Sequence, residues 1–310
     1  MERIKEALRD EVVRAGISCT DTGYVDSYKD NIFQHDMIKA FQEMFDNGSG
    51  GELRSKAEAV HSSSMLCYNF FHWISDNNPI TIEGKSYTKV FFEVKMRVLI
   101  GRSAPANMDV LLIGKKGEDG KVPLLFIESK FLEYLNAEPY NLSNSYGEQD
   151  KRYCLKKPID WDTFLQDVMG LVTTDVCTYK GGIKQGVSHL FALSNLSNDD
   201  AFKYFKEKNN LQNALKGVES IEDANILFIN LIYEPSSTKF KTDHKKFCSY
   251  KTLYSKFIDK VKKHTCIEIE PLFKTYTELW KTSENDIIKV NNGHLRQYLF
   301  DRYMKFAEMK

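Results

Sequence analysis

Residues 107–131 read NMDVLLIGKKGEDGKVPLLFIESKF, and this stretch contains the strongest fold signal in the 310-residue chain. The runs NMDVLLIG (107–114) and VPLLFIESKF (122–131) are rich in branched and aromatic apolar residues, which is typical of buried strands. Between them, KKGEDGK is a turn sequence whose Asp-Gly pair favours a reversal of the chain. The stretch therefore predicts a β-hairpin whose turn is centred near Gly117.

Helix and strand patterns continue on both sides of the hairpin. Residues 87–100 alternate apolar and charged side chains, which indicates a half-buried strand. Apolar residues at steps of three and four indicate four helices, at 3–15, 32–46, 52–71 and 161–178. Apolar runs indicate two more buried strands, at 187–195 and 226–235, and the lysine-rich tail beyond Pro235 is mostly helical in pattern.

This order of elements predicts an α/β fold with a mixed sheet flanked by helices. The glycine-rich sequence NGSGG at 47–51 marks a break in the chain. We therefore divide the chain into an N-terminal helical extension at 1–49, a core at 50–235 and a mostly helical C-terminal segment at 236–310 that packs on the core.

Composition sets only broad limits on function. The chain is 42% hydrophobic and carries 43 basic and 43 acidic residues, so nucleic-acid binding would require a local basic surface. The six cysteines include no C-x-x-C pair, which argues against a zinc site or a disulfide framework. Isolated histidines such as His61 and His189 are more often structural residues than metal ligands. Neither a signal peptide nor a membrane span is evident, so we expect a cytoplasmic protein.

Three ionisable residues converge at one end of the predicted hairpin. Glu128 and Lys130 are two residues apart on one strand, so their side chains point to the same face. Asp109 opens the partner strand, close to the end that carries Glu128. Buried carboxylates require a cation or hydrogen-bond donors, and two carboxylates with water and a backbone carbonyl suit Mg²⁺. We therefore expect Asp109 and Glu128 to bind Mg²⁺, with Lys130 beside the metal to assist a water molecule or stabilise phosphate charge.

The same residues carry a resemblance to a known family. PANMD at 105–109 and IESK at 127–130 resemble the P-D…(D/E)-x-K signature of the PD-(D/E)XK, or restriction-endonuclease-like, nucleases. The resemblance implies an α-β-β-β-α-β core within the 50–235 segment, Mg²⁺ or Mn²⁺ as cofactor, and hydrolysis of phosphodiester bonds. Asp109, Glu128 and Lys130 match the three catalytic positions, whereas Pro105 lies further from the aspartate than in the signature.

Several segments are also similar to a group of bacterial proteins assigned as restriction endonucleases. These segments are GGEL at 50–53, HSSSMLCYNFF at 61–71, ANMDVLL at 106–112, FIESKF at 126–131 and TYTELW at 275–280. The likeness favours DNA as the substrate and is compatible with a homodimer.

Other residues are candidates for supporting roles, each with a structural alternative. Glu93 on the first strand is either a further metal ligand or part of a solvated strand face. Glu52 matches the acidic residue that the family often places on its first helix, although a carboxylate there also suits a helix start. Gln166 matches a glutamine that related nucleases carry near the site. Glu133 is more typical of a surface position.

Two further E-x-K tripeptides, at 83–85 and 93–95, have no strand-borne aspartate upstream, so they do not compete with Glu128 and Lys130. The segment KRYCLKK at 151–157 lies just after the hairpin and offers a DNA-contacting set of Lys151, Arg152, Lys156 and Lys157. Charge runs are, however, usually solvated faces, and the cluster at 239–246 is not favoured.

The leading hypothesis is a Mg²⁺-dependent DNA endonuclease. The alternative is a catalytically silent module that keeps the nuclease fold and binds nucleic acid or protein. The intact set of Asp109, Glu128 and Lys130 argues for the enzyme, because a silent module has no need of converging buried charges.

Overall fold

A computed structural model describes the chain apart from residues 1–2, 49–52, 54–55, 102–103, 265–268 and 310. Its centre is a six-stranded mixed sheet with the strands in sequence order. The strands are β1 (Ile80–Ile82), β2 (Lys85–Met96), β3 (Ala106–Gly114), β4 (Val122–Lys130), β5 (Ala224–Ile232) and β6 (Ile269–Thr275). The first four strands are antiparallel, whereas β4, β5 and β6 run parallel.

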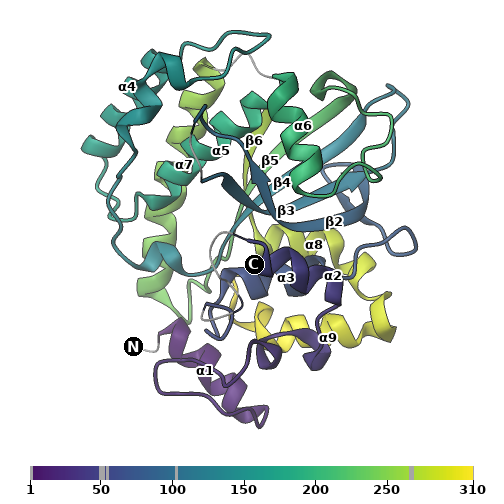
Figure 1. The fold of residues 1–310 in the computed structure, drawn as a ribbon. Helices are drawn as coiled ribbons and strands as arrows, with labels where there is room; N and C mark the ends of the chain where they lie inside the picture. The colour runs from purple at the N-terminus through teal and green to yellow at the C-terminus, as the bar shows by residue number, and fades with distance from the viewer. Residues whose placement is uncertain (1–2, 49–52, 54–55, 102–103, 265–268, 310) are drawn as a thin grey trace.

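Helices cover both faces of this sheet, which confirms the predicted α/β class with a mixed sheet flanked by helices (Figure 1). Among the described residues they are α1 (Ile4–Arg14), α2 (Lys39–Asp46), α3 (Ser63–Phe71), α4 (Trp161–Thr174), α5 (Gly181–Asn195), α6 (Asp199–Lys208), α7 (Lys241–His264), α8 (Tyr276–Ile287) and α9 (His294–Arg302). Helices α2, α3 and α8 pack on one face, and α5 and α6 pack on the other. Helix α7 runs beside α4 and against β6.

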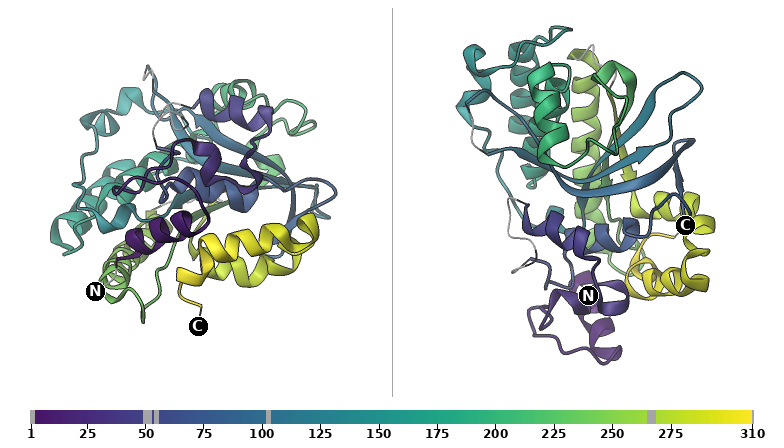
Figure 2. Two further views of the ribbon diagram at one scale, coloured as in Figure 1. Left: turned by 90° about the horizontal axis from the view of Figure 1, so that it is seen from below. Right: turned by 45° about the vertical axis from the view of Figure 1, so that its right-hand side comes forward.

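The two ends of the chain pack together on one side of the molecule (Figure 2). The backbone N–H of Ile4, at the start of α1, donates a hydrogen bond of 3.1 Å to the carboxylate of Asp243 on α7. Glu11 on the same helix forms an ion pair of 2.6 Å with Lys305. The N-terminal extension is therefore joined to the C-terminal segment rather than projecting from the core.

The predicted hairpin is confirmed as β3 and β4. Val110 pairs with Ile127 and Ile113 with Leu124, so the apolar residues of both strands fill the core. The turn closes with a hydrogen bond of 2.8 Å from the Gly117 amide to the Lys121 carbonyl.

The prediction of a buried strand at 187–195 is wrong, because these residues belong to α5. Periodicity cannot distinguish a short apolar run in a strand from one in a helix that is buried on nearly all sides. Helix α5 is buried on nearly all sides, because it lies between the sheet and α7. Gly182 and Gly186 permit this close packing, because a Cβ atom at these positions would meet Tyr250 and Phe257 of α7.

Other boundaries also differ from prediction. The helix expected at 52–71 begins only at Ser63, because preceding backbone groups bond to distant residues: the Val60 amide donates to the Gly23 carbonyl, and the Ala57 carbonyl accepts from the Asn31 side chain. The helix expected at 32–46 is a short 3-10 turn followed by α2, and the one expected at 161–178 ends at Thr174.

The C-terminal segment is mostly helical, as predicted, but it also contains β6. Residues 269–275 pair with β5 in parallel, from Ile269 opposite Ile226 to Thr275 opposite Ile232. This strand was missed because Pro271 and two charged residues interrupt its apolar pattern. The five cysteines among the described residues are free thiols, and no described helix has the length and apolar character to cross a bilayer.

Candidate active site

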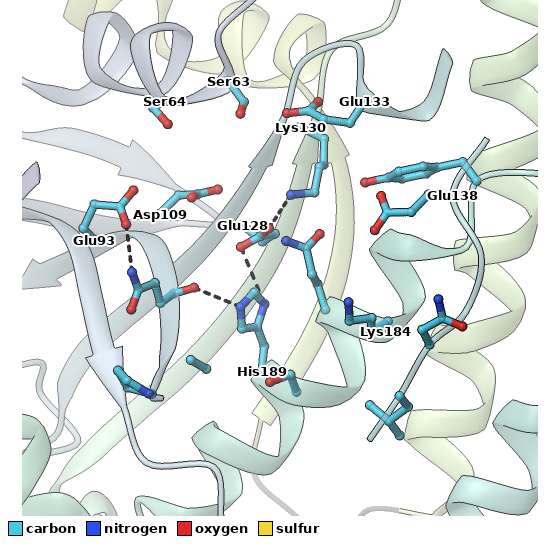
Figure 3. A pocket seen from close by; sticks show the side chains of 18 of the residues that line it. Ser63, Ser64, Glu93, Asp109, Glu128, Lys130, Glu133, Glu138, Lys184 and His189 are labelled. Carbon is cyan, nitrogen blue, oxygen red and sulfur yellow. Dashed lines mark hydrogen bonds and ion pairs between the residues drawn. The ribbon is translucent and has the colours of Figure 1, made fainter. Parts of the chain in front are cut away.

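A row of polar side chains crosses four neighbouring strands of the sheet. Val110 pairs with Ile127, so one step further along β3 and β4 brings Asp109 opposite Glu128. On the other side, the pairs Phe92–Val110 and Val94–Met108 bracket Glu93, which lies opposite Asp109. In the parallel pair, Glu128 lies opposite Asn230 of β5. Because opposed residues share one face of a sheet, the row places Glu93, Asp109 and Glu128 side by side (Figure 3).

Glu93 joins this row through an unusual backbone conformation. Its φ is +52°, in the left-handed region that a residue with a side chain rarely adopts and that costs about 1–3 kcal/mol. The side chain is 7% exposed, and its carboxylate accepts a hydrogen bond of 3.1 Å from the Asn107 amide group. The strand therefore departs from regular geometry where it contributes an acidic side chain to the row.

Asp109 lies where the ladder between β3 and β4 ends. Its carboxylate accepts a hydrogen bond of 2.7 Å from the Ser129 amide. Burial raises the pKa of Asp109 well above its usual range, and the neighbouring carboxylates of Glu128 and Glu93 raise it further, while Lys130 and the Ser129 amide oppose them. The site thus concentrates negative charge that calls for a bound cation or a proton.

Glu128 and Lys130 form a buried ion pair at the end of β4. The residues are 4% and 5% exposed, and the Lys130 Nζ atom contacts Glu128 Oε1. Burial by itself lowers the pKa of Lys130, but Glu128, Tyr179, Glu133 and Asp109 together outweigh burial and hold this pKa well above its usual range. Lys130 is therefore protonated throughout the physiological pH range.

His189 of α5 also belongs to the site. Its Nε2 atom lies 3.0 Å from the Asn107 carbonyl, and its Nδ1 atom lies 3.6 Å from Glu128 Oε2. Burial lowers the pKa of His189, although Glu128 counteracts this effect. No local motif distinguishes this histidine in the sequence, since only the packing of α5 brings it beside the carboxylates.

These side chains line a cleft of about 720 Å³ (Figure 3). The cleft lies between α3, the row of acidic side chains on the sheet, and α5. The start of α3 contributes Ser63 and Ser64 to the cleft. The wall opposite is polar and is formed by Glu133, Glu138, Lys184, Gln185 and Ser188. Glu133, which we expected at the surface, is half-buried in this wall, and its carboxylate accepts a hydrogen bond of 2.7 Å from the Phe131 amide.

The structure brings together Asp109, Glu128 and Lys130, and it adds Glu93 to them. Gln166 does not join this group, because it is exposed on α4 and does not line the cleft. Gln185 of α5 lines the cleft instead, and its position could not be predicted from the sequence because part of α5 has the apolar pattern of a buried strand. Glu52 lies outside the described residues.

The basic segment at 151–157 does not line the cleft either. Arg152 forms an ion pair of 2.6 Å with Asp162, and Lys156 lies 3.3 Å from Glu222. Lys151 is paired with Glu148. Acidic neighbours thus compensate these cations, and the structure gives no support to the predicted DNA-contacting role of Lys151, Arg152, Lys156 and Lys157.

The donor set suits a hard divalent cation with few protein ligands. No group of three or more His, Cys, Asp or Glu side chains that could hold a metal ion occurs within the described part of the chain. Two carboxylates in a polar cleft, with space for water, match the coordination that Mg²⁺ prefers. Asp109 and Glu128 would hold such an ion.

No protein-family model, curated protein or solved structure matches this chain. The function has to be inferred from the chemistry of the cleft.

Proposed function

We propose that the protein is a Mg²⁺-dependent nuclease of the restriction-endonuclease-like class that hydrolyses phosphodiester bonds in DNA. The observation that carries the proposal is the convergence of Asp109, Glu128 and Lys130 in one polar cleft. The chain order α3, β1, β2, β3, β4, α4, α5, α6, β5 supports it, because it contains the α-β-β-β-α-β core that the sequence resemblance implies, with β1, α4 and α6 as additions.

The proposed metal site consists of Asp109 and Glu128. Bound there, Mg²⁺, or Mn²⁺ as a substitute, supplies Lewis-acid activation of the phosphate group and of the attacking water. Glu93 lies next to Asp109 in the row and increases the negative potential that attracts the cation.

Lys130 and α3 would act on the phosphate. Lys130 is paired with Glu128 and lines the cleft, so it would serve as a positively charged hydrogen-bond donor to a phosphate oxygen. Helix α3 begins at Ser63 in the wall of the cleft, so the positive end of its dipole also faces an anionic substrate. The walls that carry Lys130 and α3 therefore offer two positive elements beside the carboxylates.

The test is cleavage of supercoiled plasmid DNA in Mg²⁺ or Mn²⁺, combined with Mn²⁺ binding by calorimetry. We expect wild-type protein to nick the plasmid and bind Mn²⁺. Asp109→Asn should lose both properties, and Lys130→Ala should lose cleavage. Gln166→Ala is the matched control, because Gln166 is exposed on α4 and remote from the cleft lining. Thermal unfolding verifies that each variant is folded.

The silent binding module is the competing outcome of the same experiment. A folded wild-type protein that neither cleaves any plasmid nor binds Mn²⁺ would reject the nuclease. A protein that binds Mn²⁺ and nicks DNA but keeps full activity after Asp109→Asn would place the active site elsewhere.

A further inference from the structure

A second hollow of about 200 Å³ opens beside the main cleft. The two cavities share Lys56, Ser63 and Glu133 as lining residues, so they adjoin each other. The remaining lining of this hollow, which we name the N-terminal lobe, is Lys5, Tyr24, Ala59, His61, Ser62, Leu132 and Asn136.

The N-terminal extension forms one wall of this lobe. Lys5 belongs to α1, which is held by the Ile4–Asp243 hydrogen bond to α7. Tyr24 forms an antiparallel bridge with Ala59, and the adjacent Val25 amide donates a hydrogen bond of 3.0 Å to the Glu58 carbonyl. The wall is therefore fixed relative to the segment that leads into α3, and the N-terminal extension contributes Lys5 and Tyr24 to the lobe.

The polar groups of the lobe suit a nucleic-acid strand. Lys5 is half-buried and forms no ion pair with the described residues, although Glu133 and Asp243 are close enough to act on its charge. Tyr24 is 41% exposed, so its ring is accessible for stacking. The buried Nδ1 atom of His61 has no hydrogen-bond partner. A cation, an accessible ring and an unsatisfied polar atom are thus arranged in one hollow beside the proposed reaction site.

We propose that the N-terminal lobe binds the unpaired DNA strand on one side of the scissile phosphate. In this arrangement the Lys5 and Lys56 ammonium groups contact phosphates, and the Tyr24 ring stacks on a base. The inference rests on the proposed function, because it takes the reacting phosphate to lie beside Asp109 and Glu128.

Two features favour a single strand over a duplex. Glu128 and Lys130 lie at the bottom of the cleft, where their side chains are only 5% and 7% exposed, so the backbone of the substrate has to bend into a confined space. Base stacking on Tyr24 also requires a base that has left its own stack. A flexible unpaired strand meets both conditions.

The test is fluorescence anisotropy with a short labelled oligothymidylate in EDTA, so that binding is measured without metal or cleavage. For a single strand, loss of one phosphate contact reduces the slope of log K against log salt by about 0.7, which corresponds to about fivefold weaker binding at 0.1 M salt. We expect this effect for Lys5→Ala. Tyr24→Ala should weaken binding on the order of tenfold, and Tyr24→Phe should restore it.

Lys203→Ala is the matched control, because Lys203 is an exposed lysine on α6 that lines neither cavity. Thermal unfolding verifies that Lys5→Ala and Tyr24→Ala are folded. If both folded variants bind the oligonucleotide as tightly as Lys203→Ala does, the lobe does not bind a DNA strand. Tighter binding of wild type to a duplex of the same sequence than to the single strand would also overturn the proposal. Plasmid cleavage by wild type is scored separately, so the nuclease assignment and the lobe can fail independently.

Discussion

Asp109 and Glu128 lie opposite each other on adjacent strands, one residue beyond the last pair of the β3–β4 ladder. This position places two carboxylates in a buried environment where the Ser129 amide, bonded to Asp109 at 2.7 Å, and the Lys130 ammonium are their nearest donors. The two acids are therefore held close together at a cost that these donors offset in part and that a bound cation or a proton would offset further.

Asp109→Asn should stabilise the metal-free protein at neutral pH. A carboxyl whose folded-state pKa is raised contributes stability below its unfolded pKa of 3.8 and loses it as pH rises toward the folded value. Asparagine does not ionise, so the variant avoids this loss of folding stability, which is about 1.4 kcal/mol per unit of pKa shift. Its side-chain oxygen still accepts the Ser129 hydrogen bond. Urea unfolding in EDTA at pH 5 and pH 8 measures the effect. A lower free energy of unfolding for the variant at pH 8 would contradict the assignment.

Lys130→Met should destabilise the protein by about 3–5 kcal/mol, because it leaves the buried Glu128 carboxylate without its partner. The double variant Glu128→Gln/Lys130→Met should recover most of this loss, since both charges are then absent. Urea unfolding of the wild type, the two single variants and the double variant gives the coupling energy. Simple additivity of the two single effects would show that the ion pair is not formed in solution.

His189→Leu should reduce Mn²⁺ affinity and cleavage rate about 10- to 100-fold, as expected for loss of a group that orients a metal ligand. The Nε2 atom donates to the Asn107 carbonyl, whereas the Nδ1 atom has no hydrogen-bond partner and packs 3.6 Å from Glu128 Oε2, so the ring limits the space available to that carboxylate. His189→Gln keeps a donor of similar length and should show a smaller loss. Calorimetry with Mn²⁺ provides the readout, and unchanged affinity in His189→Leu would restrict the histidine to a packing role.

The hairpin and its charged residues could be predicted because their signals are local. The signals are two apolar runs, an Asp-Gly turn and the spacing of Glu128 and Lys130 on one strand. All of them lie within 107–131, and the structure confirms the hairpin. Side chains two apart on a strand share a face whatever the remaining chain does. This short-range geometry was sufficient to bring Asp109 into the same group.

The rest of the cleft depends on packing between distant segments, which no local pattern records. His189 and Gln185 enter only because α5 is a helix, and its apolar sequence does not reveal this. Glu93 joins the row through a left-handed backbone conformation that its strand pattern does not predict. Lys5 reaches the N-terminal lobe because α1 packs on α7, more than two hundred residues away in the sequence.

The half-buried His72 should make the fold sensitive to acid. Desolvation lowers the pKa of His72 from 6.5 to about 4, where its ring stacks on Tyr68. The unfolded chain then binds more protons, so stability falls by about 3 kcal/mol as pH decreases from 6.5 to 4. His72→Phe should remove this part of the pH dependence, and His294→Gln, at an exposed position, should not. Urea unfolding at pH 7 and pH 4.5 measures how much the free energy of unfolding of each protein changes with pH. An equal change for wild type and His72→Phe would refute the assignment.

The contact between α5 and α7 predicts opposite effects for two glycine-to-alanine substitutions. A methyl group at Gly182 would overlap the hydroxyl of the fully buried Tyr250, so Gly182→Ala should destabilise the protein by about 1–3 kcal/mol. Gly170, on α4, has open space around it, and Gly170→Ala should stabilise the protein by about 0.5–1 kcal/mol through helix propensity. Urea unfolding of both variants measures the contrast. Because α5 carries His189 and Gln185 into the cleft, Gly182→Ala should also weaken Mn²⁺ binding, whereas Gly170→Ala should leave it unchanged. Equal stability of the two variants would mean that α5 and α7 are not packed as closely as the structure shows.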